Sequence, residues 1–550
     1  MTPWPPYDKA LAIKPDLENA WLGRGDILAD LKRYDEALAA YQRALAIRPD
    51  LEGAWVGRGN VFTQTGRYDE GLAAFERALS IKPDLEGGLL GRGNVLWNLK
   101  RHDEALAAYD KALSINPDLE SAWLGRGNVF LSLNRFDEAF AGYEKALSIK
   151  PDLENAWVGR GNVCGKLKRH DEAIAAYDKA LSINPDSKGA WLGRATVFSA
   201  QNRDTEALKC LNTVIELDPS YVQAHCTRSV VLLKLGEYAD GWEEYEWRKK
   251  LPLLVGNRTF SQPCLLDTEE IEGAKVFIYG EQGFGDQIHF CRYARLLADR
   301  GAKVILEAPK PLFQLFKSLD GVSQLIELGH SIPPFDYHCP LMSLRRFFRT
   351  TLENIPDKVP YLFADPAKVK AWASKLGAKS KVRIGLVWSG GFRPDQPELW
   401  SANEKRNMPL AKLAPLGNLD AAFYSLQKGD RAVSELKELL TNGWRGPSII
   451  DWTDELDDFS DTAALIENLD LVVSVDTSTA HLAGAMGKPV CLLNRFDTEW
   501  RWLPNSPWYP TVKSYRQPEP GNWEQVVENL KVDLIGMLSS KSRNHLLLQE

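Results

Sequence analysis

The sequence predicts an α-solenoid of helical repeats followed by two α/β halves, each built on a parallel sheet. Proline recurs every 34 residues, at Pro15, Pro49, Pro83, Pro117, Pro151, Pro185 and Pro219. Tryptophan keeps the same register, at Trp21, Trp55, Trp123, Trp157 and Trp191, and Leu89 and His225 fill the remaining slots. From about residue 275 the period is lost, and short apolar runs alternate with helical stretches. A fixed period of this length indicates stacked repeats, and the later alternation is typical of parallel sheets with crossover helices.

Each 34-residue unit predicts two amphipathic helices. Trp123, Gly127 and Phe130 lie on one helical stripe, and Ala139 and Tyr143 mark a second one. The small residues should let the two helices approach closely while the aromatic rings fill the grooves between them. The proline that closes each unit removes a backbone donor and ends the second helix.

This pattern resembles the tetratricopeptide repeat, and we expect the array to span residues 1–250. The chain begins inside a repeat, because Tyr7 to Pro15 has the pattern of a second helix without its first. This start suggests either an array that is truncated in the native protein or a sequence that has been trimmed.

A polar residue recurs five positions after the tryptophan slot, at Asp26, Asn60, Asn94, Asn128 and Asn162. In tetratricopeptide arrays this position faces the concave groove, so the resemblance implies that the four asparagines bind the backbone of an extended peptide. The alternative is a row of solvated polar side chains.

An arginine also recurs in every unit, at Arg24, Arg58, Arg92, Arg126, Arg160, Arg194 and Arg228. Acidic residues lie nearby at Asp35, Glu36, Asp69 and Glu70. We expect these arginines to form ion pairs within the array.

Composition excludes several classes of protein. The chain has 550 residues, of which 44% are hydrophobic and 26% charged, and these fractions are unlike those of a disordered or collagenous protein. A net charge of -7 suggests neither a nucleic-acid surface nor a polybasic membrane patch. The seven cysteines are odd in number and far apart, which favours a reducing compartment. With no signal peptide or membrane span expected, we predict a cytoplasmic protein.

The second half of the chain predicts a connector and two sheets. The connector is expected at 251–272, a first half at 273–375 and a second half at 376–550. Seven short apolar runs are the predicted strands: Lys275 to Tyr279, Lys303 to Glu307, Leu325 to Leu328, Arg383 to Trp388, Ala422 to Leu426, Leu471 to Val475 and Val490 to Leu493.

Ligands of open parallel sheets bind beyond the carboxyl ends of strands, so the loops that follow these runs are candidate sites. The loop after the first run contains Gly283, Gly285, Asp286 and His289. Its glycine spacing matches neither a dinucleotide-binding fingerprint nor a P-loop. We expect a helix to begin near Asp286, and this aspartate is either its N-cap or a functional carboxylate.

A second candidate loop follows the run Leu471 to Val475. It contains Asp476, Thr477, Ser478, Thr479 and His481. Hydroxyl residues at a strand-to-helix junction cap the helix, and the helix dipole favours an anion there. We therefore expect the ligand at this loop to be a phosphate group. His481 is either a donor to that ligand or a structural histidine.

Together the two loops resemble the heptosyltransferase-like glycosyltransferases of the GT-B fold, which has two Rossmann-like domains. The matching motifs are Gly285-Asp286-Gln287-Ile288-His289 and Asp476-Thr477-Ser478-Thr479-Ala480-His481-Leu482. The resemblance implies that Asp286 is the catalytic base and that the second loop holds the diphosphate of an activated sugar. In the first loop we expect Gly283 and Gly285 to let the backbone approach the nucleotide sugar and His289 to contact it.

Other strand-end residues fit the same nucleotide-sugar site. They are Ser389 and Gly390 after one strand, Gln427 after the next, and Lys405 and Arg406 in the polar stretch between. The family places a phosphate-binding cation in that stretch.

Repeats ahead of a GT-B half also resemble the O-GlcNAc transferases in architecture. The sequence therefore predicts an inverting, metal-independent glycosyltransferase without a cofactor, with a nucleotide-diphosphate sugar as donor and a protein or peptide acceptor in the repeat groove. The repeats could also mediate oligomerisation. The alternatives are a non-catalytic adaptor whose GT-B half senses a nucleotide sugar, and an epimerase or hydrolase on the same fold.

Overall fold

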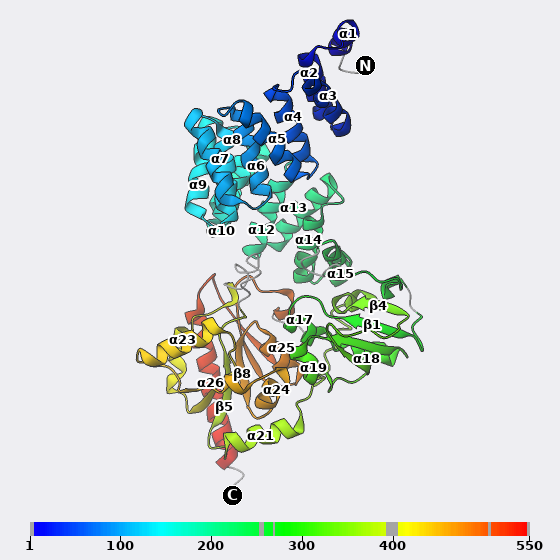
Figure 1. Ribbon diagram of the computed structural model, residues 1–550. Helices are drawn as coiled ribbons and strands as arrows, with labels where there is room; N and C mark the ends of the chain where they lie inside the picture. Colours follow the sequence, from blue (N-terminus) through cyan, green and yellow to red (C-terminus); the bar gives the residue numbers. More distant parts are fainter. Residues whose placement is uncertain (1–4, 252–257, 268–269, 392–404, 504–507, 547–550) are drawn as a thin grey trace. The chain divides into compact units, whose positions relative to one another are not determined.

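The computed structural model describes residues 5–251, 258–267, 270–391, 405–503 and 508–546. It divides into two compact units, Met1–Phe198 and Ser199–Glu550 (Figure 1). The expected end of the array at residue 250 therefore lies inside the second unit, which includes the last repeat helices as well as both sheets.

The repeats are helices of similar length that pack in consecutive pairs (Figure 1). They are α1 (Pro5–Ile13), α2 (Glu18–Asp30), α3 (Tyr34–Ile47), α4 (Glu52–Gln64), α5 (Tyr68–Ile81), α6 (Glu86–Asn98), α7 (His102–Ile115), α8 (Glu120–Ser132), α9 (Phe136–Ile149), α10 (Glu154–Lys166), α11 (His170–Ile183), α12 (Lys188–Ala200), α13 (Asp204–Leu217), α14 (Val222–Leu235) and α15 (Tyr238–Tyr245). A 3-10 turn, η1 (Glu246–Lys250), follows α15. The predicted α-solenoid is confirmed.

One aromatic ring per repeat explains the recurring glycines. A Cβ atom added to Gly127 would lie 2.7 Å from Tyr143 Cε1, and one added to Gly159 in the next repeat would lie 2.4 Å from the same atom. The ring of Tyr143 is thus clamped between two glycines of neighbouring repeats, at distances that exclude any side chain. The same arrangement holds for Tyr41, Phe75, Tyr109 and Tyr177. The expected close approach of small residues is confirmed.

Six of the seven repeated arginines form ion pairs, although with partners other than those expected. Arg126 Nε lies 3.2 Å from Asp110 Oδ1, sixteen residues earlier, and its guanidinium is 4.9 Å from the centroid of the Trp123 ring. Glu36 and Glu70 instead pair with Arg33 and Arg67, three residues before each. The suggested partners were wrong because residues sixteen apart meet across the packed helix pair, which proximity in sequence does not show.

The last repeat packs into the α/β region of the second unit. Trp242, on α15, is 2% exposed, and its indole Nε1 donates to Thr350 O at 2.7 Å. Arg248 donates to Glu281 Oε1 at 2.5 Å and to Ser343 Oγ at 2.8 Å. Leu233, Tyr238 and Trp242 belong to the same hydrophobic core as the first sheet, so this repeat is built into the region that carries the candidate site.

The α/β region contains two sheets, and every strand pair in each is parallel. The first has the order β3-β2-β1-β4, with β1 (Lys275–Tyr279), β2 (Lys303–Ala308), β3 (Val322–Glu327) and β4 (Tyr337–Pro340). The second has the order β10-β9-β8-β5-β6-β7, with β5 (Val382–Val387), β6 (Ala421–Ser425), β7 (Ile449–Ile450), β8 (Leu471–Val475), β9 (Val490–Asn494) and β10 (Val512–Arg516). The seven predicted runs all contain strands, while β4, β7 and β10 were not predicted.

Strand order fixes where ligands can bind. In the second sheet the chain crosses from β7 to β8, next to β5, and continues in the opposite direction across the sheet. This is the doubly wound order, whose binding crevice lies at the carboxyl ends of the two strands that flank the reversal, here β5 and β8. In the first sheet the corresponding pair is β1 and β4. The predicted loops after β1, β5 and β8 therefore all lie at topological switch points.

Helices cover these sheets (Figure 1). They are α17 (Phe284–Phe290), α18 (Tyr293–Asp299), α19 (Lys310–Phe316), α20 (Leu344–Phe347), α21 (Pro366–Leu376), α23 (Asp430–Thr441), α24 (Phe459–Glu467), α25 (Ser478–Ala485) and α26 (Trp523–Leu546), with the 3-10 turns η2 (Leu265–Asp267), η3 (Leu341–Ser343), η5 (Leu410–Asn418), η6 (Thr453–Glu455) and η7 (Trp500–Trp502). The two Rossmann-like sheets that the sequence predicts are thus present.

Two further findings concern membrane-spanning helices and disulfide bonds. Among the described residues, none of the helices has the length and apolar character needed to cross a bilayer. All seven cysteines lie in described segments, and none of them forms a disulfide bond.

Candidate active site

The first candidate loop places Asp286 in the first turn of α17. The helix begins at Phe284, near Asp286 as expected, but its N-cap is Gly283, so the interpretation of Asp286 as the N-cap was wrong. Asp286 is instead the third helical residue, and its Oδ2 accepts from the backbone N–H of Gly283 at 3.2 Å. This bond fixes the carboxylate over the start of the helix.

The carboxylate of Asp286 is also held by an arginine from the other sheet. Arg501, on η7, donates from Nη2 to Asp286 Oδ1 at 2.5 Å. Burial raises the pKa of Asp286 above its usual range, the Arg501 guanidinium opposes that shift, and Glu499 adds to it. A raised pKa brings a carboxylate closer to the proton affinity that a general base needs near neutral pH.

The second candidate loop forms the N-terminus of α25. Thr477 is the N-cap, and its Oγ1 accepts from the backbone N–H of Ala480 at 3.4 Å and lies 2.9 Å from Ser474 Oγ. The backbone N–H groups of Ser478 and Thr479 belong to the first turn and so have no intrahelical acceptor. This end of α25 therefore has the donors and the dipole that favour a phosphate.

The two candidate loops lie against each other. A Cβ atom added to Gly285 would lie 2.9 Å from His481 Cδ2 and 3.5 Å from the Cα of Ser478. Gly285 is thus required for the contact between the first turns of α17 and α25. We had expected this glycine to let the backbone approach the nucleotide, whereas the structure places a protein helix there.

Two buried histidines stand side by side at this contact. His481 Nδ1 lies 3.1 Å from the Tyr509 hydroxyl, and the His289 ring stacks on the His481 ring with centroids 5.2 Å apart. Burial lowers the pKa of both rings well below the usual value, and Arg292 near His289 and Arg501 near His481 lower it further. Both imidazoles are therefore neutral at pH 7.

The predicted contact between His289 and the nucleotide does not fit its position. His289 has no exposed surface, and its ring packs against Phe290 and Trp508. His289 lies three residues after Asp286 on α17, one helical turn further along, and its side chain is buried in the core. His481 is 5% exposed and lies at the edge of the same cluster.

The loop after β5 is braced by Gln427. The Gln427 Oε1 accepts from the backbone N–H groups of Trp388 and Ser389 at 3.0 and 2.9 Å, and its Nε2 donates to Ser389 O at 3.0 Å. Gln427 is 2% exposed, so it positions the loop and does not face a ligand as we had predicted. Gly390 donates to Asn407 Oδ1 at 2.7 Å, and a Cβ atom added to Gly390 would lie 2.9 Å from Arg406 Nε.

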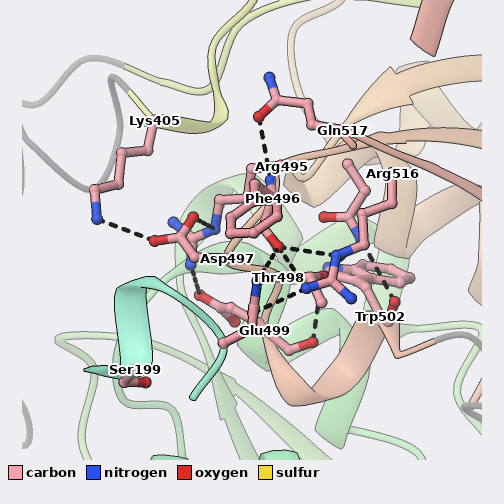
Figure 2. Close-up of polar contacts among 12 residues, drawn as sticks. Ser199, Lys405, Arg495, Phe496, Asp497, Thr498, Glu499, Trp502, Arg516 and Gln517 are labelled. Carbon is pink, nitrogen blue, oxygen red and sulfur yellow. Dashed lines mark hydrogen bonds and ion pairs between the residues drawn. The ribbon is translucent and has the colours of Figure 1, made fainter. Parts of the chain in front are cut away.

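A loop that we had not singled out carries most of the charge at the site. It runs from Arg495 to Trp502 after β9. Lys405 Nζ lies 3.0 Å from Asp497 Oδ2 of this loop, and Figure 2 shows the two side chains pointing toward each other. Arg495 lies 3.5 Å from Asp497 and 3.7 Å from Glu499. The Nη1 of Arg501 donates to Glu499 Oε2 at 2.5 Å. Trp502 Nε1 donates to Asp476 Oδ1 at 2.9 Å, which ties this loop to the start of α25.

This charged loop could have been found from the sequence, because it follows the predicted strand Val490 to Leu493 and strand ends were the places to examine. Its partners could not, since Arg501 and Asp286 are 215 residues apart.

The acidic run before α24 has a structural role. Asp458 is the N-cap and accepts from the backbone N–H of Ser460 at 2.7 Å, while Asp461 accepts from the backbone N–H groups of Asp457 and Asp458. The run is thus the N-terminal cap of α24. Within the described parts of the chain, there is no cluster of three or more His, Cys, Asp or Glu residues suited to a metal ion.

Comparison with known sequence families finds matches in both parts of the chain. Residues 18–51, 52–85, 90–154 and 154–187 match tetratricopeptide-repeat families, and residues 457–528 match glycosyltransferase family 9 (heptosyltransferase). The chain is thus similar to tetratricopeptide-repeat proteins over its repeats and to glycosyltransferase family 9 over residues 457–528. The family 9 match includes Thr477, His481 and Arg501, whereas Asp286 lies outside it.

One curated relative is Protein FlbA of Caulobacter vibrioides (strain ATCC 19089 / CIP 103742 / CB 15). It is 28% identical over 329 residues, which are 54% of this chain and 52% of FlbA. The chain thus spans about half the length of this relative.

Solved structures are similar to parts of this chain at low TM-score. The Cut9–Hcn1 hetero-tetramer of APC/C has a TM-score of 0.39 and 18% identity over 41% of this chain and 45% of that one. YrrB, a TPR protein with an unusual peptide-binding site, has a TM-score of 0.28 and 24% identity over 34% of this chain and 96% of that one.

Proposed function

We propose that this protein is an inverting, metal-independent glycosyltransferase of the GT-B type, acting in the cytoplasm without a cofactor. It transfers a sugar from a nucleoside diphosphate to a hydroxyl group of a protein acceptor. The observation that carries the proposal is the meeting of two sites from different sheets: the carboxylate of Asp286 on α17 and the N-terminus of α25. The family 9 match, which covers α25, supports the same donor class.

In the proposed reaction Asp286 accepts the proton of the acceptor hydroxyl while that oxygen attacks the anomeric carbon. The bond from the anomeric carbon to the diphosphate breaks, and its electron pair leaves on the diphosphate oxygen. A positioned general base contributes about 10²–10⁴-fold to such a step.

The leaving diphosphate needs positive charge, and the site has fixed sources of it. The first turn of α25 offers backbone N–H groups, and Arg495, Arg501 and Lys405 lie on or beside the loop after β9. Such preorganised donors stabilise charge that develops in a transition state.

The acceptor side of the proposal rests on the repeats. In three of them a tyrosine hydroxyl donates to the asparagine Oδ1, at 2.7 Å for Asn94, 2.9 Å for Asn128 and 2.8 Å for Asn162. Because the amide oxygen accepts a hydrogen bond within the repeat, the amide NH₂ is the group that would donate to a bound peptide. An NH₂ group can bind the carbonyls of an extended peptide. Asn60 differs, since the ring that packs at its repeat is Phe75, which has no hydroxyl.

A panel of nucleotide sugars, with released nucleoside diphosphate as the readout, tests the enzymatic proposal. We expect release with at least one donor, and turnover in Asp286→Asn lower by about 10²-fold or more at an unchanged melting temperature. Wild-type turnover in Asp286→Asn would return Asp286 to a structural role.

The alternative function is a non-catalytic adaptor that binds a nucleotide sugar. It is favoured by the ion pair that occupies Asp286 in this structure. Saturable donor binding without nucleotide release on any donor, with or without acceptor, would support the adaptor.

A further inference from the structure

The guanidinium of Arg501 is shared by two carboxylates. Its Nη2 donates to Asp286 Oδ1 and its Nη1 to Glu499 Oε2, both at 2.5 Å. The Arg501 side chain is 9% exposed, and its Nε is buried without a hydrogen-bond partner. The guanidinium lies 4.5 Å from the centroid of the Trp500 ring. This cation is thus held next to the candidate base, and its Nε–H has no hydrogen-bond partner.

The same cation lies close to the candidate phosphate site. Trp502, the next residue along, donates to Asp476, which directly precedes the N-cap of α25. The Trp502 ring is 4.6 Å from the His481 ring in the first turns of that helix. Arg501 therefore sits on a short segment bounded on one side by Asp286 and on the other by the start of α25.

The neighbouring cations are neutralised in the same way. Glu499 is 3.7 Å from Arg495, which is 3.5 Å from Asp497, which in turn is 3.0 Å from Lys405 (Figure 2). Positive and negative side chains thus alternate in a continuous series of ion pairs that begins at Lys405, follows this loop and ends at Asp286 on α17. A diphosphate that binds at α25 must compete with these carboxylates for its counter-charges.

We propose that Arg501 is a positioning residue shared between the base and the donor: it leaves Asp286 for the diphosphate when the donor binds. This inference rests on the proposed function and extends it. In the protein without donor, Arg501 stabilises the charged carboxylate and weakens Asp286 as a proton acceptor. In the donor complex Arg501 neutralises the leaving group, and Asp286 becomes the stronger base. The donor then has to bind before the acceptor hydroxyl can be deprotonated.

The proposal predicts a thermodynamic coupling between Asp286 and the diphosphate that depends on Arg501. Affinities are measured by calorimetry for inorganic pyrophosphate and for ADP, CDP, GDP and UDP. We expect Asp286→Asn to bind the diphosphate at least fivefold more tightly than wild type, because Arg501 no longer has to leave the Asp286 carboxylate. Couplings of this kind are typically 5- to 150-fold. Arg501→Gln should bind at least fivefold more weakly.

The double variant separates this effect from simple charge repulsion. If Asp286 only repels the diphosphate, Asp286→Asn tightens binding equally with or without Arg501. We expect no tightening in the Arg501→Gln background, and equal tightening in both backgrounds would overturn the proposal. Glu524→Gln is the matched control. It removes a carboxylate on α26 that pairs with Lys412 on η5, and this variant should bind the diphosphate as wild type does.

Two outcomes distinguish this inference from the proposed function. Wild-type affinity in both Asp286→Asn and Arg501→Gln would overturn the shared cation while leaving the transferase proposal standing on its nucleotide release. No diphosphate binding and no nucleotide release by the wild type would overturn both. Should Asp286→Asn unfold, Glu499→Gln replaces it, because it also frees Arg501 from a carboxylate and should tighten binding.

Discussion

The repeats of the first unit, called the front repeats below, and the last repeat, formed by α14 and α15, share the 34-residue period but pack against different surroundings. In the front repeats the tryptophan indole donates to the carbonyl of the proline six residues earlier, as Trp123 does to Pro117 at 2.9 Å. In the last repeat His225 fills that slot and keeps the equivalent contact, with Nε2 3.0 Å from Pro219 O. Its ring also stacks on Trp247 at 3.7 Å, and its Nδ1 lies 2.6 Å from Glu244 Oε2.

This difference shows that a repeat can keep its local hydrogen bonds while changing its role. Trp242 and Tyr245, both on α15 of the last repeat, pack around the buried guanidinium of Arg345 with ring centroids 4.2 and 4.6 Å away. Phe290 of α17 contacts the same guanidinium at 4.3 Å. The last repeat is therefore part of the core behind Asp286, whereas the front repeats form a compact unit of their own.

Truncation is expected to give the largest difference between the front repeats and the last repeat. A fragment of residues 199–550 should fold and release nucleotide from the donor, because it retains α13 to α15. A fragment of residues 251–550 should fail to fold, because Arg345, Phe290 and Trp500 lose the side chains of α15. Circular dichroism and chemical denaturation measure both fragments. A cooperative transition in residues 251–550 would make the last repeat a separable module.

Point substitution should give a smaller version of the same contrast. Trp242→Ala removes a fully buried ring and should lower the free energy of unfolding of the second unit by about 3–5 kcal/mol. Trp123→Ala removes a half-buried ring in a slot that Leu89 fills in another repeat, and should cost about 1–2 kcal/mol in the first unit. Urea denaturation followed by fluorescence measures the two transitions. Equal losses would contradict the distinction between the two regions.

The buried histidines predict a pH dependence of the second unit. His289 and His481 have pKa values well below the usual value in the folded protein, while the unfolded chain takes up protons below about pH 6.5. A depressed folded pKa contributes stability above pH 6.5 that is lost as the pH falls, with a slope of up to about 1.4 kcal/mol per pH unit for each histidine. Urea midpoints between pH 7.5 and pH 5 should therefore fall less in His289→Phe than in wild type.

His330→Gln, on an exposed loop, serves as the control for this pH dependence. It should behave as wild type across the range. An unchanged pH dependence in His289→Phe would show that other groups cause the loss.

The smallest expected effect concerns the repeat asparagines. Changing Asn94, Asn128 and Asn162 together to alanine should lower transfer to a protein acceptor by about threefold to tenfold, from the loss of amide hydrogen bonds. Transfer to a small hydroxyl compound should be unchanged. Both rates are measured with the donor identified in the panel.

A matched control for the asparagines is the triple change Tyr109→Phe, Tyr143→Phe and Tyr177→Phe. It removes the same internal hydrogen bonds but keeps the amides, and Phe75 shows that the array accepts phenylalanine in this slot. If the tyrosine variants lose as much transfer as the asparagine variants, the effect comes from the repeat structure and not from peptide binding.

Local periodicity in the sequence determined much of the architecture. The 34-residue spacing of proline and tryptophan predicted the paired helices, and apolar runs such as Leu471 to Val475 predicted strands that the structure reproduces. These features depend on neighbours a few residues apart, which is why spacing reveals them. The edge strand β10 and the short β7 escaped prediction because half-exposed or very short strands lack a continuous apolar run.

The sequence also located the loops of the candidate site, but the tertiary structure decided what each residue does there. The loops containing Asp286 and Thr477 were found from their position after strands, because the carboxyl ends of parallel strands collect at one edge of a sheet. The burial of His289, the packing of Gly285 against His481 and the ion pair between Arg501 and Asp286 depend on contacts between segments about 200 residues apart. No spacing rule reaches across that distance, since such contacts arise only when two sheets and the last repeat share one core.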